Sequence, residues 1–107
     1  MIYRTLGKTN FNISEISLGT WQVGGKWGSP FDPNNAETIL KTAIDNGINF
    51  IDTADVYSDG LSEKAVGKAV KSYHQKIYIA TKCGRKFQPH IDASYTLAAL
   101  RKSVEDS

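Results

Sequence analysis

The sequence lacks the features of several large protein classes. It has one cysteine and three prolines in 107 residues, and 40% of its residues are hydrophobic. A single cysteine, Cys83, excludes an internal disulfide and a paired-cysteine metal or redox site. The composition also excludes disordered and collagen-like chains. No metal site is expected.

Long apolar runs and an excess charge of one sign are lacking too. No apolar stretch approaches the roughly 18 residues of a membrane span, and the first residues do not resemble a signal peptide. We therefore expect a cytoplasmic protein with no membrane contact. Thirteen Lys and Arg against eleven Asp and Glu leave a net charge of +2, so no nucleic-acid partner is expected. Without a linker or a low-complexity tract, residues 1–107 are predicted to lie in one domain, with no second domain.

What is present is an alternation of strand and helix patterns. The first half is predicted to contain a hairpin around residues 7–10, a strand at 15–18, a long loop at 20–32 and a helix from Asp32-Pro33 to Asn46-Gly47. The second half is predicted to contain a strand at 48–51, a helix at about 62–72 and a strand at 77–80. Asp92 is then expected to cap a third helix that continues through Leu97, Leu100 and Val104. Such an order predicts an α/β fold with a parallel sheet, right-handed crossovers and helices on its outer face.

Two charged residues come directly after apolar strands. Asp52 follows Phe50-Ile51, and Lys82 follows Ile79-Ala80-Thr81. Ligands of parallel α/β sheets bind beyond the carboxyl ends of the strands, where alternation would place this carboxylate and ammonium together. The simplest interpretation is an ordinary ion pair. However, Tyr57 lies five residues beyond Asp52, and a nearby cation favours the anion of a phenol.

These residues lie in segments that resemble one family. The run GINFIDTADVY at 47–57, continued by SEKAVG at 62–67, is similar to the signature of the aldo-keto reductases. The segments YRTLG at 3–7, LGTW at 18–21 and ATK at 80–82 support the resemblance in the correct order. The resemblance implies a (β/α)8 TIM barrel, of which this chain would supply an N-terminal hairpin and about three β/α units.

The family resemblance also assigns catalytic roles. It implies that Asp52, Tyr57 and Lys82 are three of four catalytic residues, with Tyr57 as the general acid, Lys82 favouring its anion and Asp52 holding the ammonium. The fourth residue, a histidine, is missing, because neither His74 nor His90 stands at a matching place. Both histidines are predicted to be solvated.

Cofactor and substrate residues follow from the same resemblance. Gly19, Thr20, Trp21 and Asp52 would bind NADP(H) near its nicotinamide, and Trp21 and Trp27 would form an apolar wall of the substrate pocket. An anchoring role for Trp27 in its loop is equally compatible with the sequence. Cys83 would face away from Lys82, toward the helices, as a buried thiol.

The resemblance implies reduction of small aldehydes and ketones by direct hydride transfer from NADPH. The alternative is a non-catalytic NADPH-binding regulatory subunit resembling the potassium-channel β-subunits. A barrel needs about 250 residues, so the isolated chain is expected to be an inactive fragment. Its unpaired strand edges would favour association with another chain.

Overall fold

The structure is a computed structural model that describes residues 1–26 and 28–107. Its elements are strands β1 (Tyr3–Thr5), β2 (Asn12–Ser14) and β3 (Leu18–Gly19), helix α1 (Pro33–Asp45), strand β4 (Phe50–Asp52), the 3-10 segment η1 (Tyr57–Gly60), helix α2 (Leu61–Val70), strand β5 (Tyr78–Ala80), the 3-10 segment η2 (Asp92–Ser94) and helix α3 (Leu97–Asp106). The order agrees with the predicted alternation of strands and helices.

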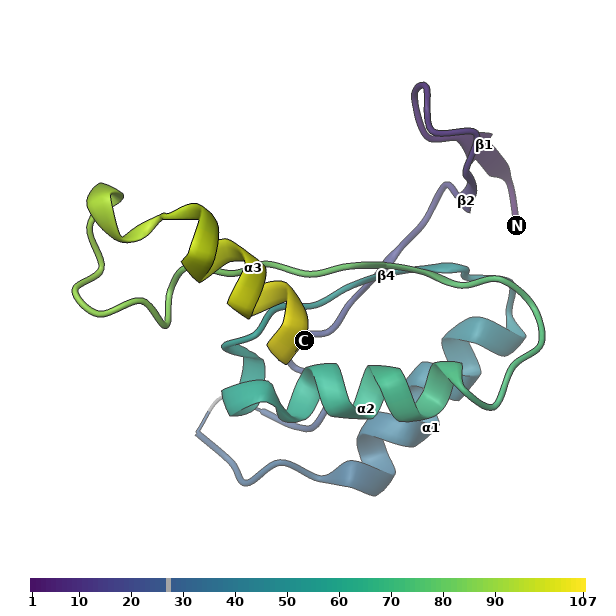
Figure 1. Ribbon diagram of the computed structural model, residues 1–107. Helices are drawn as coiled ribbons and strands as arrows, with labels where there is room; N and C mark the ends of the chain where they lie inside the picture. Colours follow the sequence, from purple (N-terminus) through teal and green to yellow (C-terminus); the bar gives the residue numbers. More distant parts are fainter. Residues whose placement is uncertain (27) are drawn as a thin grey trace.

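A parallel sheet organises the centre of the molecule. Its strand order is β3-β4-β5, and Gly19, Asp52 and Ala80 lie in register at its carboxyl end. Helices α1 and α2 lie side by side against one face of this sheet (Figure 1). The predicted α/β fold with a parallel sheet is confirmed.

The core lies between this sheet and the two helices. Its hydrophobic cluster consists of seven buried residues: Val23, Ala36, Leu40, Ile44, Ile51, Val66 and Ala69. Leu40 and Ile44 come from α1, Ile51 from β4 and Val66 from α2, so each element contributes one side to a shared interior. Each large side chain buried in this way stabilises the fold by roughly 1.5–3 kcal/mol.

Helix α1 begins and ends where the sequence predicts. The Asp32 carboxylate accepts hydrogen bonds from the backbone amides of Asn34 and Asn35, at 2.9 and 3.1 Å. Pro33 occupies the first turn, where its missing N–H costs no helical hydrogen bond. At the other end Gly47 has a φ of 91°, a left-handed conformation that glycine adopts without steric cost.

The β1–β2 hairpin is held at the amino-terminal end of the sheet. The Phe11 ring stacks on Tyr78 with centroids 4.7 Å apart, and Lys76 Nζ lies 5.2 Å from each of these two rings. The Tyr3 hydroxyl donates to the Gly47 carbonyl at 2.8 Å. The hairpin therefore contacts the opposite end of the sheet from Asp52.

Two predicted element boundaries were wrong. The third helix begins at Leu97 and is capped by Thr96, whose hydroxyl accepts from the Ala99 amide at 3.1 Å, whereas Asp92 begins η2. The first sheet strand spans only Leu18–Gly19, because the chain turns beforehand: Ser14 Oγ donates to the Ile16 carbonyl at 2.7 Å.

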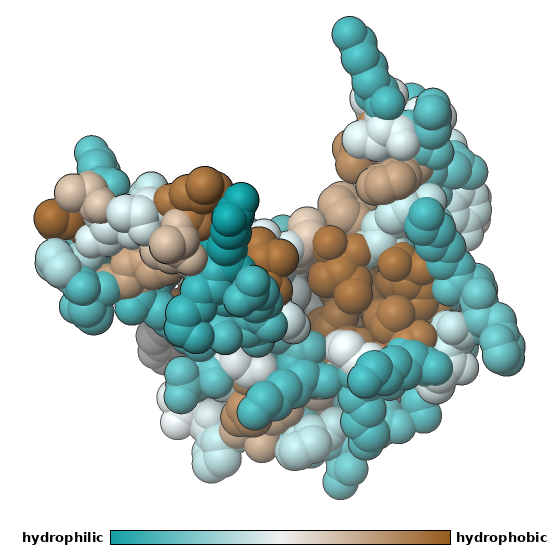
Figure 2. Space-filling view, viewed as in Figure 1, coloured by the Kyte–Doolittle hydropathy of each residue, from teal (hydrophilic) through white to brown (hydrophobic). Residues whose placement is uncertain are grey.

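Apolar side chains also gather on one open face. Figure 2 shows them in the hollow between the hairpin and the C-terminal segment. Ile79 of β5 is 46% exposed, and Leu97 and Val104 of α3 are 65% and 76% exposed.

In the described part of the chain, no helix combines the length and apolar character that crossing a membrane requires.

Candidate active site

The centre of the candidate site is an ion pair at the carboxyl end of the sheet. Asp52 ends β4 opposite Ala80, and Lys82 stands two residues beyond that position. Lys82 Nζ lies 2.5 Å from Asp52 Oδ1 and donates to the Thr53 carbonyl at 2.9 Å. The predicted ion pair is therefore confirmed, and a second acceptor fixes the ammonium.

Tyr57 lies beside this pair. Lys82 Nζ is 5.0 Å from the centroid of the Tyr57 ring, within the range of a cation–π contact. Burial lowers the pKa of Lys82, but its interactions with the Asp52 carboxylate and the Tyr57 hydroxyl raise it more, so the net shift is upward. Lys82 therefore stays an ammonium at neutral pH. A protonated amine, a carboxylate and a phenol thus share one strand end.

A left-handed turn follows Tyr57 directly. Ser58, Asp59 and Gly60 have φ angles of 48°, 55° and 87°. This conformation costs a non-glycine residue roughly 1–2 kcal/mol, so two such residues in sequence need support from their surroundings. The turn connects Tyr57 directly to the start of α2. Sequence analysis missed it, and the Asp-Gly pair was the available signal.

Three buried hydroxyl groups, of Thr20, Thr53 and Ser62, form a second feature that sequence analysis missed. We call them the hydroxyl cluster, and each residue is at most 1% exposed. Ser62 Oγ lies 2.8 Å from Thr20 Oγ1 and 3.0 Å from Thr53 Oγ1. Thr20 Oγ1 donates to the Asp52 carbonyl at 3.0 Å. The cluster joins the first turn of α2 to the ends of β3 and β4, and the Thr20 bond connects it to the backbone of Asp52.

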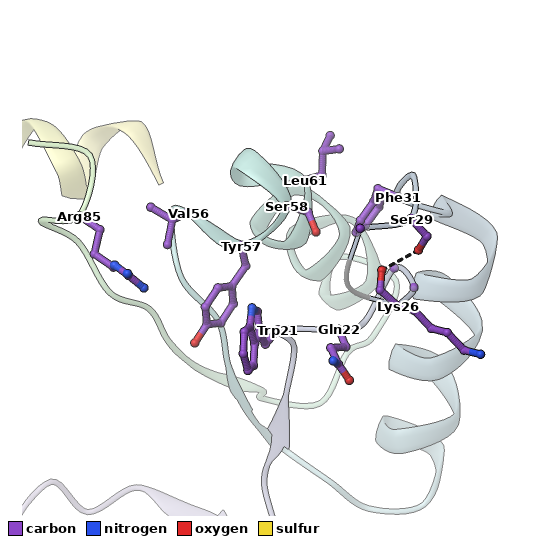
Figure 3. A pocket seen from close by; sticks show the side chains of 13 residues that line it. Trp21, Gln22, Lys26, Ser29, Phe31, Val56, Tyr57, Ser58, Leu61 and Arg85 are labelled. Carbon is purple, nitrogen blue, oxygen red and sulfur yellow. Dashed lines mark hydrogen bonds between the residues drawn. The ribbon is translucent and has the colours of Figure 1, made fainter.

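A cavity of about 940 Å³ opens beside Tyr57. Its lining residues are Trp21, Gln22, Gly24, Gly25, Lys26, Gly28, Ser29, Phe31, Val56, Tyr57, Ser58, Leu61 and Arg85. Figure 3 shows the Trp21 indole next to the Tyr57 ring. The structure thus brings two of the predicted site residues to one cavity, while the prediction for Trp27 lies outside the described residues.

Comparisons with known proteins agree with this geometry. A profile of the Aldo/keto reductase family matches residues 15–107. The chain belongs to this family. It is 44% identical to aldo-keto reductase YhdN of Bacillus subtilis over 85 residues, which cover 77% of this chain and 25% of YhdN. A probable voltage-gated potassium channel subunit beta of Arabidopsis thaliana is 35% identical over 85 residues, covering 77% of this chain and 25% of that protein.

A solved aldo-keto reductase shares the fold. The holo form of AKR11C1 from Bacillus halodurans superposes with a TM-score of 0.80 and 33% identity, covering 99% of this chain and 35% of that chain. The neighbouring structures are (β/α)8 barrels, and the hairpin and β/α units described above correspond to part of such a barrel. The chain thus spans about a quarter to a third of the length of the relatives it matches.

Of the remaining predicted residues, Gly19 lies beside open space, Thr20 is buried, and the two histidines are exposed. Gly19 ends β3, and a Cβ placed there would meet no atom within 4 Å. Thr20 is fully buried, and its hydroxyl belongs to the hydroxyl cluster. His74 and His90 are exposed, as predicted.

Cys83 is exposed as well, so the prediction of a buried thiol was wrong. The reason is local, because β5 ends at Ala80 and the alternation of a strand no longer orients the residues beyond it.

Proposed function

We propose that the whole protein is an NADP(H)-dependent oxidoreductase that reduces aldehyde and ketone groups of small molecules to alcohols. The observation that carries the proposal is the contact of Lys82 with both Asp52 and Tyr57 at the edge of the cavity. Family membership supports the same activity. Asp52, Tyr57 and Lys82 are the proposed catalytic residues.

Each of these residues has a distinct part in the proposed mechanism. The Tyr57 hydroxyl donates its proton to the carbonyl oxygen as that oxygen gains negative charge. The Lys82 ammonium, 5.0 Å from the ring centroid, stabilises the phenolate that remains. Asp52 and the Thr53 carbonyl hold the ammonium in place, at 2.5 and 2.9 Å.

The strand ends also fit a nicotinamide ring. Gly19 leaves open space above β3, in register with Asp52, and the exposed Trp21 borders the cavity beside Tyr57. Gly19, Trp21 and Asp52 are therefore proposed to hold the nicotinamide end, with Thr20 positioning Asp52 from behind. When bound, NADPH supplies the hydride. The holo form of the Bacillus halodurans relative supports binding of a cofactor.

The test is carbonyl-dependent NADPH oxidation by a complete barrel. We define the barrel chimera as residues 1–107 in place of the matching segment of Bacillus subtilis YhdN. It should reduce aldehydes with NADPH, and YhdN itself is the positive control. A folded chimera that binds NADPH and reduces no carbonyl compound would contradict the proposed function.

The alternative is a non-catalytic, NADPH-binding regulatory subunit. Its support is the similarity to the Arabidopsis channel subunit beta. The Asp52, Tyr57 and Lys82 arrangement favours the enzyme, because binding alone requires no proton donor beside an ammonium. The same assay separates the two functions: a regulatory subunit would bind NADPH without turnover.

The isolated 107-residue chain should turn over no carbonyl substrate. It is proposed to be the N-terminal part of one barrel domain, in the cytoplasm, and its edge strands β3 and β5 offer unpaired backbone groups for association with another chain. Steady NADPH oxidation by this chain, with longer contaminants excluded by intact mass, would contradict this proposal.

A further inference from the structure

Arg85 is a charged residue of the cavity that the proposed mechanism does not use. It lines the same cavity as Trp21 and Tyr57, and Figure 3 shows its guanidinium group pointing toward Tyr57. Within residues 1–26 and 28–107, this guanidinium makes no hydrogen bond and no ion pair. Arg85 is exposed, and its guanidinium carries five N–H donors that no acceptor of the described residues engages.

The backbone that carries Arg85 is anchored. Residues 84–87 form a turn in which the Phe87 amide donates to the Gly84 carbonyl at 3.0 Å. Phe87 packs edge-on against Tyr95, with ring centroids 5.1 Å apart. Gly84 is buried with a φ of 110°, and a Cβ there would overlap the Tyr95 ring. These contacts hold Arg85 at the tip of a defined turn.

The cavity suits a ligand that combines an apolar body with a negative charge. Its described lining includes the apolar side chains of Trp21, Phe31, Val56 and Leu61, and no acidic residue. Lys26 is the second cation of that lining, but its ammonium points away from Tyr57 in Figure 3. Of the two cations of that lining, Arg85 is thus the one directed toward Tyr57.

We propose that Arg85 determines substrate choice by binding an oxyanion, a carboxylate or a phosphate, on the carbonyl substrate. The guanidinium fork binds such groups through two parallel charge-assisted hydrogen bonds. With the oxyanion at Arg85 and the carbonyl oxygen at the Tyr57 hydroxyl, the substrate is fixed at both ends. The inference rests on the proposed function, because it assigns the substrate class of the same site.

Matched substrates test this inference in the barrel chimera. The pair 4-carboxybenzaldehyde and methyl 4-formylbenzoate differs in the charge at one end and in the methyl group that removes it, and 4-formylphenyl phosphate distinguishes phosphate from carboxylate recognition. The ratio of kcat/KM for the anionic substrate to that for the ester should fall about tenfold in Arg85→Gln and less in Arg85→Lys. Lys86→Gln is the control, since Lys86 does not line this cavity. Its ratio should match that of the unmodified chimera.

Equal ratios in Arg85→Gln and the unmodified chimera would overturn the inference and leave the proposed function standing. A folded, NADPH-binding chimera that reduces no aldehyde would contradict the proposed function instead. A binding measurement then decides the inference separately. Benzoate, but not benzamide, should shift the Arg85 Nε–H resonance of the folded, NADPH-bound barrel chimera. Absence of that shift would overturn the inference.

Discussion

The two ends of strand β5 carry similar side chains with different surroundings. Before the strand, Lys76 Nζ lies 5.2 Å from the centroids of both Phe11 and Tyr78. After it, Lys82 Nζ lies 5.0 Å from the centroid of Tyr57. Both ends thus combine a lysine ammonium with aromatic rings.

The difference is in what else each ammonium meets. Lys82 is bound by the Asp52 carboxylate and the Thr53 carbonyl, beside a cavity. Lys76 forms no ion pair within the described residues and lies over rings that join the hairpin to the sheet. An ammonium over an aromatic ring is therefore a packing contact by itself. The proposed proton transfer from Tyr57 requires, in addition, a carboxylate that orients the ammonium and an accessible phenol beside it.

Removing the phenol hydroxyl at the Lys82 end should have the largest effect. In the barrel chimera, Tyr57→Phe keeps the ring but loses the transferable proton, so kcat should fall at least ~10²-fold with little change in NADPH affinity. Steady-state kinetics and NADPH titration measure the two quantities. Tyr78→Phe, at the Lys76 end, is the matched control and should leave kcat within about twofold. If Tyr57→Phe retains near-normal turnover, another group is the acid.

Neutralising the two lysines should sharpen the contrast. Lys82→Met removes the ammonium that stabilises the phenolate, so kcat should fall by about 10²-fold, and the residual rate should follow a different pH dependence. Lys76→Met should change stability slightly and leave the pH profile of kcat unchanged. Rate profiles between pH 6 and 10 for both variants are the measurement. If kcat depends on pH in the same way in both variants, the proposed distinction between the two ends of β5 is wrong.

Buried and exposed hydroxyls should differ in their effect on stability. Ser62→Ala removes the hydrogen bond of the buried Thr53 hydroxyl to Ser62 and one of the two bonds of the buried Thr20 hydroxyl, so the free energy of unfolding should fall by about 1–3 kcal/mol. Tyr3→Phe removes the exposed bond to the Gly47 carbonyl and should cost about 0.5–1 kcal/mol. Urea unfolding of both variants in the barrel chimera compares them. Equal losses would contradict a special contribution of the hydroxyl cluster.

The smallest expected effect is a change in titration. Asp52 and Tyr57 raise the pKa of Lys82 above its ordinary value of 10.5, after burial has lowered it. Asp52→Asn should therefore bring this pKa down, as followed by the Cε resonance of labelled Lys82. Because the pKa of Lys82 is raised in the folded protein, its ammonium contributes to the free energy of unfolding below pH 10.5. This contribution is lost as the pH rises through the folded-state pKa. An unchanged Lys82 titration in Asp52→Asn would show that the carboxylate does not govern it.

Features that depend on neighbours along the chain were predictable from the sequence. The α/β order follows from apolar periodicity, and the start of α1 follows from Asp32 and Pro33, which act on amides within three residues. The Asp52–Lys82 pair was predictable as well, because both residues lie at the carboxyl ends of neighbouring parallel strands, which meet at one edge of the sheet. The assignment of Tyr57 depended on the family signature.

Other features depended on contacts between segments distant in sequence. The hydroxyl cluster joins Thr20 to Ser62 across 42 positions, and no local pattern distinguishes a buried serine from an exposed one. Cys83 and Arg85 both follow the end of β5, where strand alternation no longer orients side chains. The exposure of Cys83 and the direction of Arg85 therefore could not be predicted from the strand pattern. The sequence by itself determined the elements, the two strand-end charges and the family. The tertiary structure decided which polar groups are buried and which face the cavity, because burial is a property of packing between elements.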